Sequence, residues 1–106
     1  MLSNNEVDNF LVKMGATSHA INQKNILRYM INGKSIAYVS SNVSPVRLSL
    51  RCDPVLGKSL IQKYESVMSA HNLDPKKWIT IVLTGQLEDH EVFDLVTHAG
   101  VLIAEE

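Results

Sequence analysis

The dipeptide Asn32-Gly33 constrains the fold of this chain more than any other feature of the sequence. It separates two segments that carry β-branched and aromatic residues, Ile26–Ile31 and Lys34–Ser40. Asn-Gly readily supplies the two positive φ values of a type I′ turn, which joins antiparallel strands with the correct twist. We therefore predict a β-hairpin here, and an antiparallel sheet as the starting point of the fold.

A further strand is predicted over residues 46–51, where apolar and polar side chains alternate without a break. This alternation is typical of a strand with one buried face. Leu48 and Leu50 are expected to face the core, and Arg47 and Arg51 to point outward. Residues 78–84 are mostly apolar and rich in β-branched side chains, so they predict a central, largely buried strand.

Three helices are predicted around these strands. A capping box, Ser-x-x-Glu, opens the first helix over residues 4–14. Asp53 followed by Pro54 provides an N-cap and a proline at the first helical position of the second helix, whose apolar side is expected to extend to Val67. The third helix is expected from Glu88, where carboxylates complement the positive end of the helix dipole.

The expected fold is α+β, with the element order α-β-β-β-α-β-α in a single domain over residues 1–106. This order lacks regular βαβ alternation, so it favours a two-layer sandwich with an antiparallel four-stranded sheet and helices on one face. The other face would be open. Its expected polar side chains are Arg47, Ser49 and Arg51 from one strand, Thr80 and Thr84 from another, and Arg28 from the hairpin.

Net charge is −1, but the charges are unevenly distributed along the chain. From Trp78 onward there are six acidic residues and no basic ones. The start of the sequence lacks the pattern of a signal peptide, and no apolar run approaches the length of a membrane span. Cys52 is the only cysteine, so no intrachain disulfide is expected. The expectation from these features is a cytoplasmic protein.

Three blocks of sequence carry a family resemblance: GKSIA at residues 33–37, LRCDP at 50–54 and KKW at 76–78. In order and spacing they resemble the MmcQ/YjbR family. This resemblance implies a frataxin-like (CyaY-like) α/β sandwich and a DNA-binding role with a double-wing arrangement. The chain departs from the family pattern at residues 72–75, where His-Leu-Asn-Lys is usual, and at residues 99–100, where Ser-Tyr is frequent.

Two binding functions follow as hypotheses, and neither involves an enzyme or a cofactor. The first is a module that contacts duplex DNA through basic side chains on strand and turn positions. The second is a protein-interaction module that uses the basic sheet face or the acidic last helix. The candidate nucleic-acid-binding residues are Arg28, Lys34, Arg47, Arg51, Lys76 and Lys77.

Other groupings of chemically active side chains have a simpler interpretation. His90, Asp94 and His98 are spaced i, i+4, i+8 on the last helix and are expected on its solvated face instead of around a metal. His71 with Asp74 and Cys52 with Asp53 lack a third orienting group, so no catalytic site is predicted. Trp78 opens an apolar strand and is expected to pack in the core instead of stacking on a base.

Overall fold

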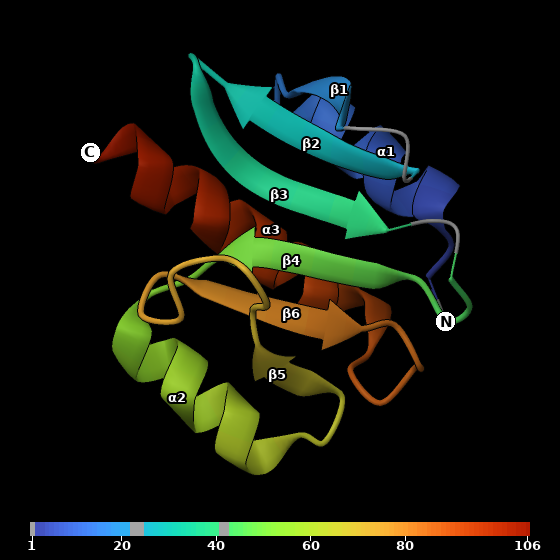
Figure 1. The fold of residues 1–106 in the computed structure, drawn as a ribbon, viewed down its shortest axis with the longest axis vertical. Helices are drawn as coiled ribbons and strands as arrows, with labels where there is room; N and C mark the ends of the chain where they lie inside the picture. The colour runs from blue at the N-terminus through green and yellow to red at the C-terminus, as the bar shows by residue number, and fades with distance from the viewer. Residues whose placement is uncertain (1, 22–24, 41–42) are drawn as a thin grey trace.

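The computed structural model describes residues 2–21, 25–40 and 43–106. These residues form three helices and one six-stranded sheet (Figure 1). Along the chain the elements are α1 (Asn4–Lys13), β1 (Thr17–Ile21), β2 (Ile26–Ile31), β3 (Lys34–Ser40), β4 (Arg47–Arg51), α2 (Pro54–Lys63), β5 (Val67–Ser69), β6 (Trp78–Val82) and α3 (Asp89–Ala104).

The sheet is antiparallel throughout, with the spatial order β1-β2-β3-β4-β6-β5. The α+β class and the antiparallel arrangement are confirmed. The predicted number of four strands is wrong and the predicted order α-β-β-β-α-β-α is only partly correct, because the sheet also contains β1 and β5. Both lie at edges of the sheet, where four of the five side chains of β1 are exposed and β5 has only three residues. Neither therefore carries the alternating pattern that identifies a half-buried strand.

The predicted hairpin is confirmed in its turn. Asn32 and Gly33 have φ values of 52° and 76°, as a type I′ turn requires. Away from the turn, the register of β2 against β3 shifts by one residue between Tyr29 and Met30. This irregularity brings Arg28 opposite Tyr38.

The helix starts follow the sequence signals closely. Ser3 and Glu6 form the capping box of α1, and the Asp53 carboxylate accepts hydrogen bonds from the first turn of α2. The expected extension of α2 to Val67 is wrong, since α2 ends at Lys63 and Val67 begins a strand. Among the described residues, no helix is both long and apolar enough to cross a membrane.

Helices α1 and α3 lie behind the sheet in the view of Figure 1, and α2 lies beside the β5 edge. The first and last helices contact each other through Phe10 and Phe93, whose stacked ring centroids are 4.4 Å apart. Gly100 of α3 lies against Met14, directly after α1. The helices therefore cover one face of the sheet and leave most of the opposite face uncovered.

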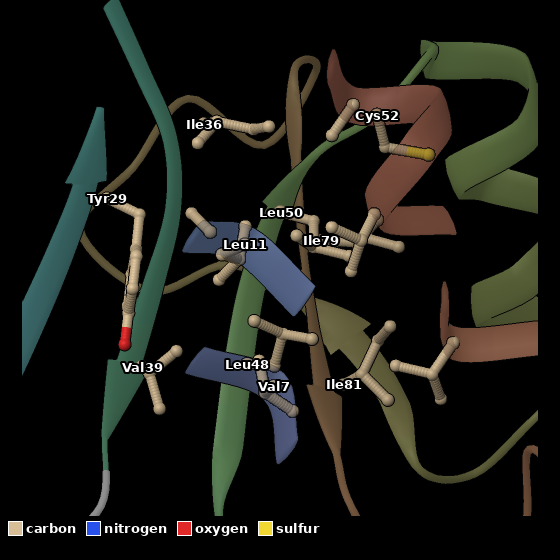
Figure 2. Packing of buried hydrophobic residues seen from close by; sticks show 14 of the residues in the cluster. Val7, Leu11, Tyr29, Ile36, Val39, Leu48, Leu50, Cys52, Ile79 and Ile81 are labelled. Carbon is tan, nitrogen blue, oxygen red and sulfur yellow. The ribbon is translucent and has the colours of Figure 1, made fainter. Parts of the chain in front are cut away.

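The main core lies between these helices and the sheet (Figure 2). Leu48 pairs with Ile81 and Leu50 with Ile79 across β4 and β6, so all four side chains share one face. They are buried together with Val7 and Leu11 of α1. Because side chains alternate along a strand, the residues between them point to the other face, where the candidate site lies.

Candidate functional site

One row of side chains crosses the open face of the sheet. The strand registers pair His19 with Arg28, Arg28 with Tyr38, Tyr38 with Ser49 and Ser49 with Thr80. Neighbouring strands in a sheet are about 4.8 Å apart, so the side chains in such a row lie side by side on one face. The hydroxyl oxygens of Ser49 and Thr80 lie 2.8 Å apart and share a hydrogen bond.

A recess of about 570 Å³ is formed where the loop between β5 and β6 passes over this row. Figure 1 shows this loop in front of the sheet. We call this recess the sheet-face pocket. Its volume is within the range of ligand-binding pockets in proteins, about 300 to 1,000 Å³. Its lining residues are Ile21, Ile26, Arg28, Tyr38, Ser40, Arg47 and Ser49 from the strands, His71, Asn72 and Leu73 from the loop, and Thr80.

The sheet-face pocket has the electrostatics of an anion site. Arg28 is held by a 2.8 Å hydrogen bond from its Nε to the Ser35 hydroxyl, which leaves its terminal nitrogens for other acceptors. Arg47 is exposed and forms no ion pair with any described residue. No carboxylate is among the described residues that line the pocket. Two guanidinium groups are therefore available to a ligand without competition from a neighbouring acid.

The other candidate basic residues lie elsewhere. Arg51 forms an ion pair with Glu106, and Lys34 donates hydrogen bonds to the carbonyl oxygens of Ile103 and Glu106 at 3.2 and 2.9 Å. Lys77 directly precedes β6, whose first residue pairs with Arg51. The hydrogen bond from Arg51, with the charges of Arg51, Lys34 and Lys77, lowers the pKa of the Glu106 carboxyl.

Lys76 lines a second cavity of about 560 Å³ between α2, β6 and the β5–β6 loop. The six predicted DNA-binding residues are thus divided. Arg28 and Arg47 share the sheet-face pocket, Lys76 lines the second cavity, and Arg51, Lys34 and Lys77 line neither. Arg51 lies on the sheet face opposite Leu48 and Leu50, as expected, but its side chain is only 14% exposed and is paired with Glu106.

Trp78 is buried, as expected, but on the unexpected side of the sheet. It pairs with Arg51 across β4 and β6, on the face opposite the main core. Its ring centroid lies 5.3 Å from that of Tyr38 and 5.8 Å from the guanidinium carbon of Arg51. Trp78 therefore packs against Tyr38 on the open face and contacts Arg51 through a cation–π interaction.

Cys52 also lines the second cavity, next to Gly57 of α2. Burial, with a smaller contribution from the neighbouring Asp53 carboxylate, raises the pKa of its thiol to about 11. A reactive cysteine requires the opposite shift, because the thiolate is the nucleophile. The geometry thus supports a structural role for this residue, as the sequence indicated.

The histidines of α3 do not share one environment. His90 lies 3.4 Å from Glu88 and is exposed. His98 was expected on the solvated face, but it is half-buried and its Nε2 accepts a 3.2 Å hydrogen bond from the Asp53 backbone N–H. In the described part of the chain, no three His, Cys, Asp or Glu side chains are grouped as a metal site requires.

His71 and Asp74 also lie in different environments. His71 lines the sheet-face pocket, whereas the Asp74 carboxylate accepts a hydrogen bond from the Lys76 backbone N–H within its own loop. Tyr38 is a site residue that the sequence did not indicate. A regular two-residue hairpin turn would place Arg28 opposite Ala37, and only the shift near Tyr29 brings Tyr38 beside it.

Comparisons with known proteins bear on family and fold. A family model described as YjbR matches residues 12–99. The crystal structure of Deinococcus radiodurans protein DR2400, with the domain DUF419, superposes with a TM-score of 0.91 at 21% identity, covering 100% of this chain and 81% of that one.

A protein from Pseudomonas syringae, PsR293, has a TM-score of 0.78 at 19% identity, covering 96% of this chain and 98% of that one. At these identities the likeness concerns the fold alone. The search of curated proteins finds no match.

Proposed function

This chain belongs to the YjbR family, and we propose that it is a non-enzymatic module that binds single-stranded DNA in the sheet-face pocket. The observation that supports this proposal is the combination of two accessible arginines, Arg28 and Arg47, with the aromatic ring of Tyr38 in a recess whose described lining residues include no carboxylate. Basic grooves with aromatic side chains are the common means of holding unpaired nucleic-acid strands.

The shape of the pocket favours an unpaired strand over the duplex DNA of the first hypothesis. A recess between a sheet and a loop can receive a base or sugar that has left its helical stack. A duplex would have to reach the same residues with its backbone alone. Arg28 and Arg47 would contact phosphate oxygens, since guanidinium groups match their geometry, and Tyr38 would pack against a base.

The test is a fluorescence-anisotropy titration with a labelled twelve-nucleotide single strand and its duplex at low salt. Arg28→Ala and Arg47→Ala should each weaken binding of the single strand. The logarithm of the affinity should also fall less steeply with the logarithm of the salt concentration. In each variant the slope should shrink in magnitude by about 0.7, the value for one phosphate that the protein no longer neutralises. Lys13→Ala, which removes the same charge from the exposed end of α1, is the matched control. This function is excluded if the protein does not bind the single strand at low salt, or if Arg28→Ala and Arg47→Ala bind it no more weakly than Lys13→Ala does.

The aromatic contact is tested separately. Tyr38→Leu should weaken the single-strand complex by about 5- to 150-fold, in line with base stacking worth about 1 to 3 kcal/mol. Tyr38→Phe keeps the ring and should bind nearly as the original protein does. Thermal unfolding of both variants shows whether the packing against Trp78 survives. A large loss of affinity in Tyr38→Phe would contradict the stacking role.

A groove between α2 and α3 supports a second candidate function, the recognition of a basic amphipathic helix. Its lining combines apolar side chains with carboxylates: Leu56, Leu60, Leu87, Glu91, Asp94, Leu95 and His98. A partner with apolar anchors and lysines would complement both. A Leu/Lys model peptide should bind, and Asp94→Lys should abolish that binding while Glu65→Lys, outside the groove, should not. Equal effects of the two substitutions would dismiss this alternative.

A further inference from the structure

Three cations from separate parts of the chain gather at one end of the sheet. Arg51 is the last residue of β4, Lys34 is the first residue of β3, and Lys77 directly precedes β6. Figure 1 shows that α3 runs behind the sheet and ends on this side. Glu106, which follows α3, lies among the three cations. We call Arg51, Lys34 and Lys77 the strand-end cluster.

The guanidinium of Arg51 is held in place before any ligand arrives. It lies over the Trp78 ring, and its Nη2 donates to the Glu106 carboxylate. Its Nε is shielded from solvent and has no hydrogen-bond partner among the described residues. A guanidinium offers two adjacent N–H groups to one oxyanion. Because Arg51 binds only one carboxylate oxygen here, it uses only part of its capacity to bind an oxyanion.

The two lysines add charge from the other sides. Lys34 is anchored by the Ile103 and Glu106 carbonyl oxygens, and an ammonium group has three donors, so one N–H is left over. Lys77 has its backbone fixed beside Arg51, because its carbonyl oxygen accepts a 2.8 Å hydrogen bond from Cys52 N–H. Its side chain is exposed. The lowered pKa of Glu106 is consistent with a net attraction for anions at this point.

We propose that the strand-end cluster is a phosphate-binding site and that the Glu106 carboxylate occupies it in the manner of a displaceable phosphate mimic. A phosphate group presents more acceptor oxygens than a carboxylate and can accept from two adjacent N–H groups of Arg51 together with the lysines. This site is separate from the sheet-face pocket, whose lining includes none of the three cations.

The phosphate could belong to a free small anion or to a nucleic-acid backbone. Arg47 and Arg51 lie four residues apart on β4 and on the same face, which corresponds to roughly 13 Å along the strand. A strand bound in the sheet-face pocket could therefore reach the cluster. Free phosphate needs no such connection, so the inference does not rest on the proposed function.

The experiment compares Glu106→Ala with Glu105→Ala, a matched loss of charge at the exposed neighbouring residue. Each protein is titrated with inorganic phosphate at constant ionic strength, with the Trp78 indole and Arg51 Nε resonances as NMR probes, and separately with the labelled single strand. Removing the competing carboxylate should tighten phosphate binding about fivefold, the scale of one exposed ion pair. Adding Arg51→Gln to Glu106→Ala should abolish the gain.

Tighter binding of inorganic phosphate identifies a site for small anions, and tighter binding of the single strand alone identifies a backbone phosphate. If Glu106→Ala binds neither probe more tightly than Glu105→Ala, the inference is wrong. Thermal unfolding of each variant verifies that the fold is retained. The effects of Arg28→Ala and Arg47→Ala on single-strand binding are measured independently. Failure of DNA binding in the sheet-face pocket can therefore be told apart from failure of phosphate binding in the strand-end cluster.

Discussion

The hydroxyl of Tyr29, at the centre of β2, donates a 2.6 Å hydrogen bond to the carboxylate of Asp8 on α1. Tyr29 is only 1% exposed, so this bond joins the first helix to the sheet from inside the core. Hydrogen bonds to charged acceptors contribute about 1.5 to 3 kcal/mol. Because Asp8 is only partly buried and can regain water, Tyr29→Phe should lower the free energy of unfolding by about 1 to 2 kcal/mol, measured by urea denaturation. Tyr38→Phe, on the opposite face, is the control and should change stability less.

The same contact predicts a loss of stability at high pH. Burial, and then the hydrogen bond and charge of Asp8, raise the pKa of Tyr29 above the ordinary value near 10. Since the folded state holds this proton more tightly than the unfolded state, its contribution is complete below about pH 10 and declines as the pH rises further. The urea midpoint of the original protein should therefore fall more steeply between about pH 10 and 11.5 than that of Tyr29→Phe. Parallel curves would show that Tyr29 does not titrate in this way.

The features that the sequence predicted correctly depend on short segments. The Asn32-Gly33 turn, the alternation around Leu48 and the N-cap at Asp53 each involve residues close together in the chain. Local backbone geometry and side-chain period determine them. The two edge strands that the sequence did not indicate are different, because their pairing partners alone define them. Thr17–Ile21 and Val67–Ser69 become strands only when β2 and β6 offer a free edge.

The candidate site was predicted in part for the same reason. Arg28 and Arg47 were correctly placed on the open face, since strand alternation fixes the face of each side chain. Arg51 was not predicted to be paired, because Glu106 is 55 residues away and reaches it only after α3 has crossed the sheet. The shift near Tyr29, which brings Tyr38 beside Arg28, has no signature in the local sequence either.

Lys34 should act as a cap for α3 from outside the helix. The last turn of α3 contains no basic residue, and Lys34 supplies a cation to the Ile103 carbonyl oxygen. Cations at the negative end of a helix dipole contribute about 0.3 to 1 kcal/mol. Lys34→Met should therefore destabilise the protein by roughly this amount in low salt, and by less in about 1 M NaCl because salt screens the interaction. Lys76→Met, in an exposed loop, serves as the control, and an equal loss there would argue against the capping role.

Two helical glycines should respond differently to alanine. A Cβ at Gly57 would lie 3.1 Å from Ile79 Cγ2 in the core, whereas a Cβ at Gly100 would meet the flexible end of Met14. Alanine is favoured over glycine in a helix by about 1 kcal/mol. Overpacking a core costs about 1 to 3 kcal/mol. We expect Gly57→Ala to be destabilising and Gly100→Ala to be neutral or stabilising, as measured by thermal unfolding. The reverse order would mean that Ile79 yields more easily than Met14.

Cys52 should be nearly inert in the folded protein. With a thiol pKa of about 11, only about one molecule in a thousand carries a thiolate at pH 8, compared with about a quarter for an ordinary cysteine. Its reaction with iodoacetamide should thus be roughly a hundredfold or more slower in the native protein than in urea-unfolded protein. The native rate should rise about tenfold per pH unit from about pH 8 to 10. A native rate that levels off near pH 8.5 would show that the thiol is neither buried nor shifted, and that the second cavity is open to small electrophiles at this residue.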